Sequence, residues 1–284
     1  METLAIRKIH VDSRYRTNLA DSHSDFRLKL SQPVNFPDDV EMIADNISIP
    51  NTVQTVNASA HYLYMAEYDS NLQVVCRAVP ITHGYYTGPS LAQEIGTQLN
   101  VLGTLPTGWT SGTYLVQYDP DSGNIRIHAN FAKLFHVMSD AELQAHDGSG
   151  GLTVNKNRPA SINNILRYYS TTDAVSNPVS YDLYNTFNSL YLDLLPVHAF
   201  MICSNLNDGR VMSPQGLGDT IACVPCNVNA GITVHHNATT SADAVLVSRR
   251  SFETLTFQLR NSQGELVDLN GASWSMSLVF VKKF

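Results

Sequence analysis

The sequence predicts an all-β fold, a jelly-roll β-sandwich of antiparallel strands with a short embedded helix. Three observations support this prediction. Many Val, Ile, Thr, Tyr and Phe residues accompany 16 glycines and 12 prolines, a composition that favours short strands joined by turns. Several segments alternate apolar and polar residues with period two, which is typical of antiparallel strands with one buried face. Turn residues separate these segments at intervals of about 8–12 residues, as they do in β-sandwiches.

The alternation is clearest in three segments, at 26–30, 254–260 and 273–280. In each of them every second residue is apolar, and the residues between are polar or charged, except Val279. The predicted inward-facing residues are Phe26, Leu28, Leu30, Leu255, Phe257, Leu259, Trp274, Met276, Leu278 and Phe280. Three such segments in one chain indicate strands that bury one face.

Turn and capping residues place the remaining elements. The run Tyr-Asp-Pro-Asp-Ser-Gly at 118–123 predicts a hairpin with Gly123 at positive φ, and 261–264 and 270–271 are two further turns. Over 87–99, a capping Thr87, Pro89 in the first turn and apolar residues four apart predict a helix. A second helix is predicted over 139–146, with Ser139 as its cap.

Composition restricts the class of protein. Hydrophobic residues make up 43% of the 284 residues and charged residues only 15%, which excludes a disordered chain and a coiled coil. We expect one jelly-roll domain over residues 1–284, with an insertion or long loops around 130–160. No apolar run approaches the roughly 18 residues of a membrane span, and the charged N-terminal ten residues do not resemble a secretory signal. The net charge of −7 argues against a protein that coats nucleic acid.

No motif predicts catalysis or a cofactor. Cys223 and Cys226 form a Cys-x-x-Cys pair in an apolar strand, and the only nearby ligand types are the adjacent His235 and His236. Because neighbours on a strand point to opposite faces, we interpret the pair as buried structural thiols rather than a metal or redox site. The ten histidines show no triad or ligand spacing. We therefore expect no catalytic residues, no cofactor, no metal and no enzymatic activity.

Five short motifs occur in an order that resembles a known family. They are Ile-His-Val-Asp-Ser-Arg-Tyr-Arg at 9–16, Ser-Asp-Phe-Arg-Leu-Lys-Leu at 24–30, Asn-Ile-Ser-Ile-Pro-Asn-Thr at 46–52, Val-Pro-Ile-Thr-His-Gly-Tyr-Tyr at 79–86, and the strand pair within 266–278. This series resembles the single jelly-roll penton and minor capsid proteins of large double-stranded DNA viruses, virophages and Polinton-type elements. The segment 130–245 resembles the family only in its general sequence character and contains none of these motifs. Tyr15 stands at a position that is often acidic in the family.

The resemblance implies a structural virion protein, an icosahedral capsid vertex (penton) subunit that assembles as a homopentamer in the virion, made in the host cell. A non-vertex minor capsid protein is the alternative within the family. The partners that the resemblance implies for this protein are copies of itself, a major capsid protein, a fibre or spike protein, and packaged DNA. For the DNA contact, the basic termini are candidates: residues 1–30 carry a net charge of +2, and Lys282 and Lys283 lie near the C-terminus.

The candidate interface residues are Asp12, Arg14 and Arg16. A short polar cluster that ends a strand suits a turn within the subunit, and its arginines equally suit pairing with a carboxylate of a neighbour. The preceding run, 4–11, is expected to be an unpaired edge strand that lies against the neighbouring subunit.

Two other classes of protein remain open. A lectin-like jelly roll that binds carbohydrate or a receptor would use aromatic stacking faces, and the candidates are Tyr62, Tyr64, Tyr85, Tyr86, Trp109, Tyr168 and Tyr169. A cupin-type enzyme would need histidines and a carboxylate converging in the barrel, and no strand offers the His-x-His spacing. We rank the capsid subunit first, the lectin second and the enzyme last.

Overall fold

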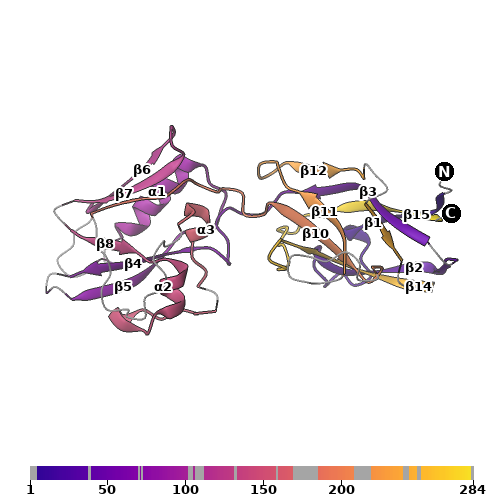
Figure 1. Cartoon of the computed structure of the whole chain (residues 1–284), viewed down its shortest axis with the longest axis horizontal. Coiled ribbons are helices and arrows are strands. Elements are labelled where there is room, and N and C mark those ends of the chain that lie inside the picture. The colour runs from indigo at the N-terminus through magenta and orange to yellow at the C-terminus, as the bar shows by residue number, and fades with distance from the viewer. Residues whose placement is uncertain are drawn as a thin grey trace. The chain divides into compact units, whose positions relative to one another are not determined.

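The chain folds into two compact units in the computed structural model (Figure 1). Unit 1 comprises Met1–Val53 and Val197–Phe284, and unit 2 comprises Gln54–Pro196. The structure describes residues 5–37, 40–69, 71, 73–101, 105, 112–130, 133–157, 159–168, 185–207, 219–238, 243–247 and 251–282. Among these residues no helix is long and apolar enough to cross a membrane.

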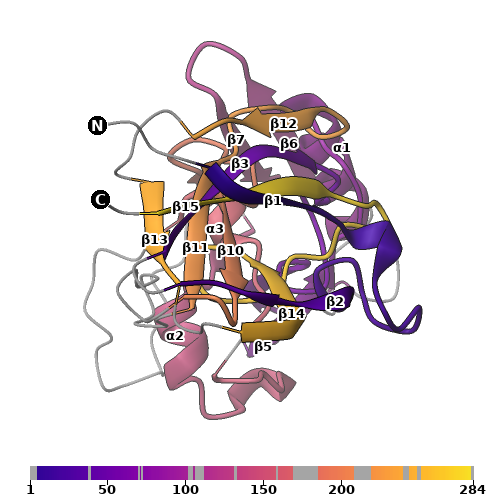
Figure 2. The same cartoon turned by 90° about the vertical axis from the view of Figure 1, so that its right-hand side faces the viewer.

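Unit 1 consists of two antiparallel sheets. Its strands are β1 (Ala5–Asp12), β2 (Asp25–Asn35), β3 (Val40–Pro50), β10 (Ala199–Ser204), β11 (Thr220–Pro225), β12 (Thr233–His236), β13 (Ala244–Leu246), β14 (Ser251–Arg260) and β15 (Ser275–Lys282). One sheet has the order β1-β15-β3-β12, with β13 also paired to β3, and the other has the order β11-β10-β14-β2. Figure 2 shows the two sheets as separate layers.

The order of these strands is that of a jelly roll. If the short β13 is set aside, the eight remaining strands alternate between the sheets so that the first, third, sixth and eighth form one sheet. The second, fourth, fifth and seventh form the other, which is the double Greek-key arrangement. The predicted all-β jelly roll is therefore confirmed.

Aromatic side chains from both sheets fill the core between them. The rings of Phe26 on β2 and Phe257 on β14 lie 5.5 Å apart, and Trp274, just before β15, packs edge-on against both. All three side chains are buried, as the period-two pattern predicts. Contacts of this kind add to the apolar area that the two sheets bury.

Unit 2 carries two three-stranded sheets and the helices. Its elements are β4 (Tyr62–Tyr68), β5 (Val74–Pro80), α1 (Gly88–Leu99), β6 (Tyr114–Asp119), β7 (Asn124–Ala129), β8 (Phe135–Val137), α2 (Asp140–Ala145), α3 (Asn163–Leu166) and β9 (Thr186–Asn188). The sheets have the orders β5-β4-β8 and β6-β7-β9. Both predicted helices and the predicted hairpin are present, with Gly123 at φ 68°.

Unit 2 is inserted between β3 and β10, which changes the expected domain organisation. We expected one domain over 1–284 with an insertion or long loops around 130–160. The chain forms two compact units, of which the second spans Gln54–Pro196. Unit 2 begins at Gln54, shortly after the end of β3. Just before it, the buried Asn51 side chain donates to Val228 O at 2.8 Å, so hydrogen bonding rather than a linker-like sequence marks this boundary.

The two chain segments that lead into and out of unit 2 lie next to each other. The hydroxyl of Thr55 donates to the carbonyl of Leu194 at 3.4 Å. The insertion therefore enters and leaves at one place, as a long loop would.

Helix α1 lies along strand β6. Thr87 caps it through the amide of Ser90, and Leu91, Ile95 and Leu99 are buried as predicted. A Cβ at Gly88 would lie 2.4 Å from the Tyr118 ring, so only glycine permits this close approach. At the other end, the side-chain amide of Asn100 donates to Tyr114 O and accepts from Tyr114 N, at 2.9 and 3.1 Å. Asn100 thus occupies the hydrogen-bonding position of a neighbouring strand on the edge of β6.

Candidate subunit interface at the N-terminal turn

The polar motif that follows β1 forms a short 3₁₀ helix, Ser13–Tyr15, with Asp12 as its cap. The Asp12 carboxylate accepts a hydrogen bond from Arg14 N at 2.9 Å. Asp12 itself is only 4% exposed. A carboxylate in this position satisfies a backbone donor at the start of the helix, so the sequence Asp-Ser-Arg turns the chain as it leaves the sheet.

Arg14 pairs with Asp12 of its own chain. Its Nη2 lies 2.6 Å from Asp12 Oδ2, and its Nε also donates to the carboxylate. The hydrogen bonds from Arg14 hold the pKa of Asp12 below its ordinary value. The Arg14 side chain remains 67% exposed, so this pair contributes little to stability.

Arg16 folds the following loop back onto the turn. Its guanidinium donates to three carbonyl oxygens, those of Ser13, Leu19 and Asp21, at 3.1, 3.1 and 2.8 Å. One side chain therefore fixes the whole loop between β1 and β2. The structure brings together all three predicted interface residues and uses each for contacts within the chain.

Trp274 anchors the turn to the sandwich. Ser13 N donates to Trp274 O at 3.0 Å, Trp274 N donates to Ser13 Oγ at 3.0 Å, and the indole Nε1 donates to His23 O at 2.7 Å. Both Ser13 and Trp274 are buried. The turn is thus held at its base by buried hydrogen bonds, which are costly to leave unmade.

The loop displays two large apolar side chains that sequence reasoning did not select. Tyr15 is 73% exposed and Leu19 is 75% exposed. They flank the hydrogen bonds of Arg16 on a loop whose backbone is fixed. The sequence signal that could have identified this surface is Tyr15, because a surface turn does not require an aromatic residue inside its polar motif.

Strand β1 is paired within the chain, contrary to expectation. It runs antiparallel to β15, from Ala5 opposite Val281 to Asp12 opposite Ser275. A run near the N-terminus and a run near the C-terminus therefore form neighbouring strands of one sheet. Within the described residues β1 is the end strand of that sheet, so its second edge remains open.

The cysteine pair differs in part from the prediction. Cys226 is buried, as predicted, but Cys223 is exposed because it lies on the outer face of β11, between the buried Ile221 and Val224. Burial raises the pKa of the Cys226 thiol. In the part of the chain that the structure describes, no three His, Cys, Asp or Glu side chains cluster as metal ligands would.

Those aromatic residues proposed for a lectin that the structure describes do not form one stacking face. Tyr64 is buried with its hydroxyl bonded to Pro159 O, and Tyr86 donates to Thr82 O. Tyr168 packs edge-on against Phe187, while Tyr85 is exposed. Trp109 and Tyr169 lie outside the described residues.

Comparison with known proteins gives a likeness in structure but none in sequence. No family model and no curated protein sequence matches the chain. Among solved structures, the chain is similar to the crystal structure of the mavirus penton protein, with a TM-score of 0.52 and 10% sequence identity. The match covers 96% of this chain and 98% of that protein, so it includes the sandwich and the inserted unit. The predicted resemblance is confirmed at the level of the fold, which is penton-like.

Proposed function

We propose that this protein is a structural subunit of an icosahedral capsid vertex that assembles as a homopentamer in the virion. The observation that carries the proposal is the full-length likeness to a penton protein, because it extends over an insertion between β3 and β10 as well as over the jelly roll. A jelly roll alone is shared by proteins of many functions. A structural role also agrees with the absence of catalytic motifs from the sequence.

The N-terminal loop supports this proposal as a subunit contact. In a five-fold ring each subunit buries one patch against the next subunit and a complementary patch against the previous one. Tyr15 and Leu19 supply the apolar part of such a patch, and the hydrogen bonds of Asp12 and Arg16 fix its shape before assembly. Arg14 Nη1 has no partner among the described residues, so it retains donors for an acceptor on the neighbouring subunit. The three predicted residues therefore act in assembly by holding and flanking this contact.

The pairing of β1 with β15 supports a second contact, with packaged DNA. Because Ala5 lies opposite Val281, basic side chains from both termini gather at one end of the sheet. Arg7, Lys8 and Lys282 are exposed there. We propose that this end faces the genome, and that the remaining surfaces of the subunit contact the major capsid protein and a fibre or spike.

Mass photometry and negative-stain imaging of the purified protein test the proposal. We expect a species of five times the 31.3-kDa chain mass, with five-fold rings in the images. Rings of another order would favour a non-vertex capsid protein. Monomers alone, at all concentrations and salt conditions, would overturn the assembly proposal.

A further inference from the structure

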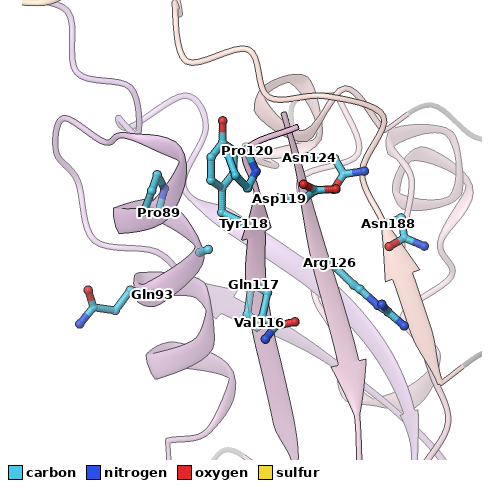
Figure 3. Close-up of a pocket in the computed structure, with 11 residues that line it drawn as sticks. Pro89, Gln93, Val116, Gln117, Tyr118, Asp119, Pro120, Asn124, Arg126 and Asn188 are labelled. Carbon is cyan, nitrogen blue, oxygen red and sulfur yellow. The ribbon is translucent and has the colours of Figure 1, made fainter. Parts of the chain in front are cut away.

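A groove of about 930 Å³ lies on unit 2 beside helix α1 and the β6–β7 hairpin (Figure 3). One side of it is apolar and is formed by Pro89, Ala92, Val116, Tyr118 and Pro120. The rest is polar and is formed by Gln93, Gln117, Asp119, Asn124, Arg126 and Asn188. A concave surface that combines an apolar wall with several polar groups is typical of a small-molecule site.

The polar side chains form rows across three strands. Gln117 of β6 lies opposite Arg126 of β7, which lies opposite Asn188 of β9. Because cross-strand partners point to the same face of a sheet, these three side chains stand next to one another, as Figure 3 shows. Asp119 and Asn124 form the adjacent row on the same face.

This central row makes no contacts of its own. Among the described residues, the side chains of Gln117, Arg126 and Asn188 have neither a hydrogen bond nor an ion pair. The next row is different, since His128 Nδ1 lies 2.9 Å from Thr186 Oγ1. Within the described part of the chain the Arg126 guanidinium therefore forms no ion pair, and a carboxamide lies on each side of it.

We propose that this groove binds an acidic glycan, with the sugar carboxylate on Arg126. A guanidinium binds a carboxylate through two parallel hydrogen bonds. The carboxamides of Gln117 and Asn188 each offer donors and an acceptor, which suits hydroxyl groups that also do both. Pro120, which follows Asp119 at the end of β6, adds apolar surface for the C–H face of a sugar ring.

The chemistry of the groove favours a glycan over a peptide. Extended peptides commonly bind by adding a strand to an open sheet edge. The edge of β6 beside the groove is covered, because α1 packs along it and Asn100 occupies the backbone groups of Tyr114. What remains accessible is a face of side chains rather than a row of backbone donors and acceptors.

Isothermal titration of the full chain with 3′-sialyllactose, lactose and lactose 3′-sulfate, which is sulfated and has no carboxylate, tests this proposal. We expect 3′-sialyllactose to bind at least tenfold more tightly than lactose, because only the former carries a carboxylate. Arg126→Ala should weaken this binding at least tenfold, Arg126→Lys less, and the double variant Gln117→Ala/Asn188→Ala by several fold. Lys156→Ala, an exposed cation elsewhere in unit 2, is the matched control and should bind as the unchanged protein does.

Several results would overturn the proposal. One is equal binding of lactose and 3′-sialyllactose, and another is tighter binding of the sulfated sugar, which would reject the carboxylate assignment. Equal competition by an acidic peptide would reject a glycan as the ligand. Wild-type affinity in Arg126→Ala, with unchanged circular dichroism, would reject the site itself. These outcomes are independent of whether the protein forms rings.

Discussion

Glu67 and Arg77 form a buried, two-point ion pair between strands β4 and β5 of unit 2. Arg77 Nε lies 2.8 Å from Glu67 Oε2, and Nη2 lies 2.9 Å from Oε1. Glu67 is fully buried and Arg77 is one-tenth exposed. The Tyr114 hydroxyl also donates to Glu67, and Arg77 Nη2 donates to Leu99 O at 3.3 Å. Burial and the Glu67 charge raise the pKa of Tyr114, which keeps the phenol protonated as a donor.

Removing one partner of this pair should destabilise unit 2. Arg77→Met leaves the Glu67 carboxylate buried without its cation, and such losses cost about 3–5 kcal/mol. The double variant Glu67→Gln/Arg77→Met should lose less, because no buried charge remains. Urea unfolding of the full chain measures the free energy of unfolding of the single and the double variant. A single variant as stable as the wild type would show that the pair contributes nothing.

Deleting residues 1–11 should unfold the sandwich rather than merely prevent assembly. The deletion removes β1, leaves one edge of β15 unpaired and takes away the fully buried Val11. We expect the cooperative thermal transition of unit 1 to be lost. Circular dichroism and light scattering measure this transition. A truncated chain that melts like the full chain would mean that β1 acts only between subunits.

Polar substitution on the N-terminal loop should prevent ring formation and leave the monomer intact. Tyr15→Ser and Leu19→Ser remove exposed apolar surface and no core contact, so monomer stability should change by less than about 0.5 kcal/mol. Arg14→Ala should behave similarly but more weakly, because the Arg14 side chain is 67% exposed in its pair with Asp12. Ile232→Ser, at a residue 52% exposed, is the matched control. Rings formed by Tyr15→Ser/Leu19→Ser would exclude this loop from the interface.

Acidification should lower stability between pH 7 and pH 5. Burial, with repulsion from Arg16 and His83 respectively, lowers the pKa of His23 and His61 below their ordinary value of 6.5. The unfolded chain therefore takes up protons below about pH 6.5 that the folded chain does not, so stability is full above that pH and falls as pH decreases. Melting temperatures across this range measure the effect. His23→Gln should flatten the profile, whereas His235→Gln, at an exposed position, should not.

Only one of the four thiols should react in the native protein. Cys223 is exposed, while Cys76, Cys203 and Cys226 are buried, and burial raises the pKa of Cys203 to about 11. Because the reagent reaches an exposed thiol and not a buried one, maleimide should label Cys223 alone, and Cys223→Ser should abolish labelling. Chelator and reductant should leave melting unchanged. Fast labelling of two or more thiols would contradict this assignment.

Elements defined by local pattern could be predicted from the sequence. The helix that Thr87 caps, the hairpin at Gly123 and the burial of Phe257 and Trp274 all depend on residues close together in the chain. The pairing of β1 with β15 could not be predicted, because periodicity identifies a strand but not its partner. The face of Cys223 was also unpredictable, since the run Ile-Ala-Cys-Val contains no polar residue to mark the outer side.

The domain boundary and the groove were missed for similar reasons. The chain segments that enter and leave unit 2 are held by particular hydrogen bonds, such as that of Thr55 with Leu194. Their amino-acid composition does not differ from that of the neighbouring sequence, so composition does not mark the boundary. The row of Gln117, Arg126 and Asn188 depends on the register of β9, a three-residue strand. Three polar residues so far apart in the chain form no motif until that register is known.

The single crossing point at Thr55 and Leu194 makes unit 2 an exchangeable module. A segment that begins and ends at one point can grow, shrink or be replaced while the strands of the sandwich keep their partners. Selection can then alter what unit 2 presents to its surroundings at a different pace from the sandwich. A chimaera that carries a foreign module at this point should still fold its jelly roll.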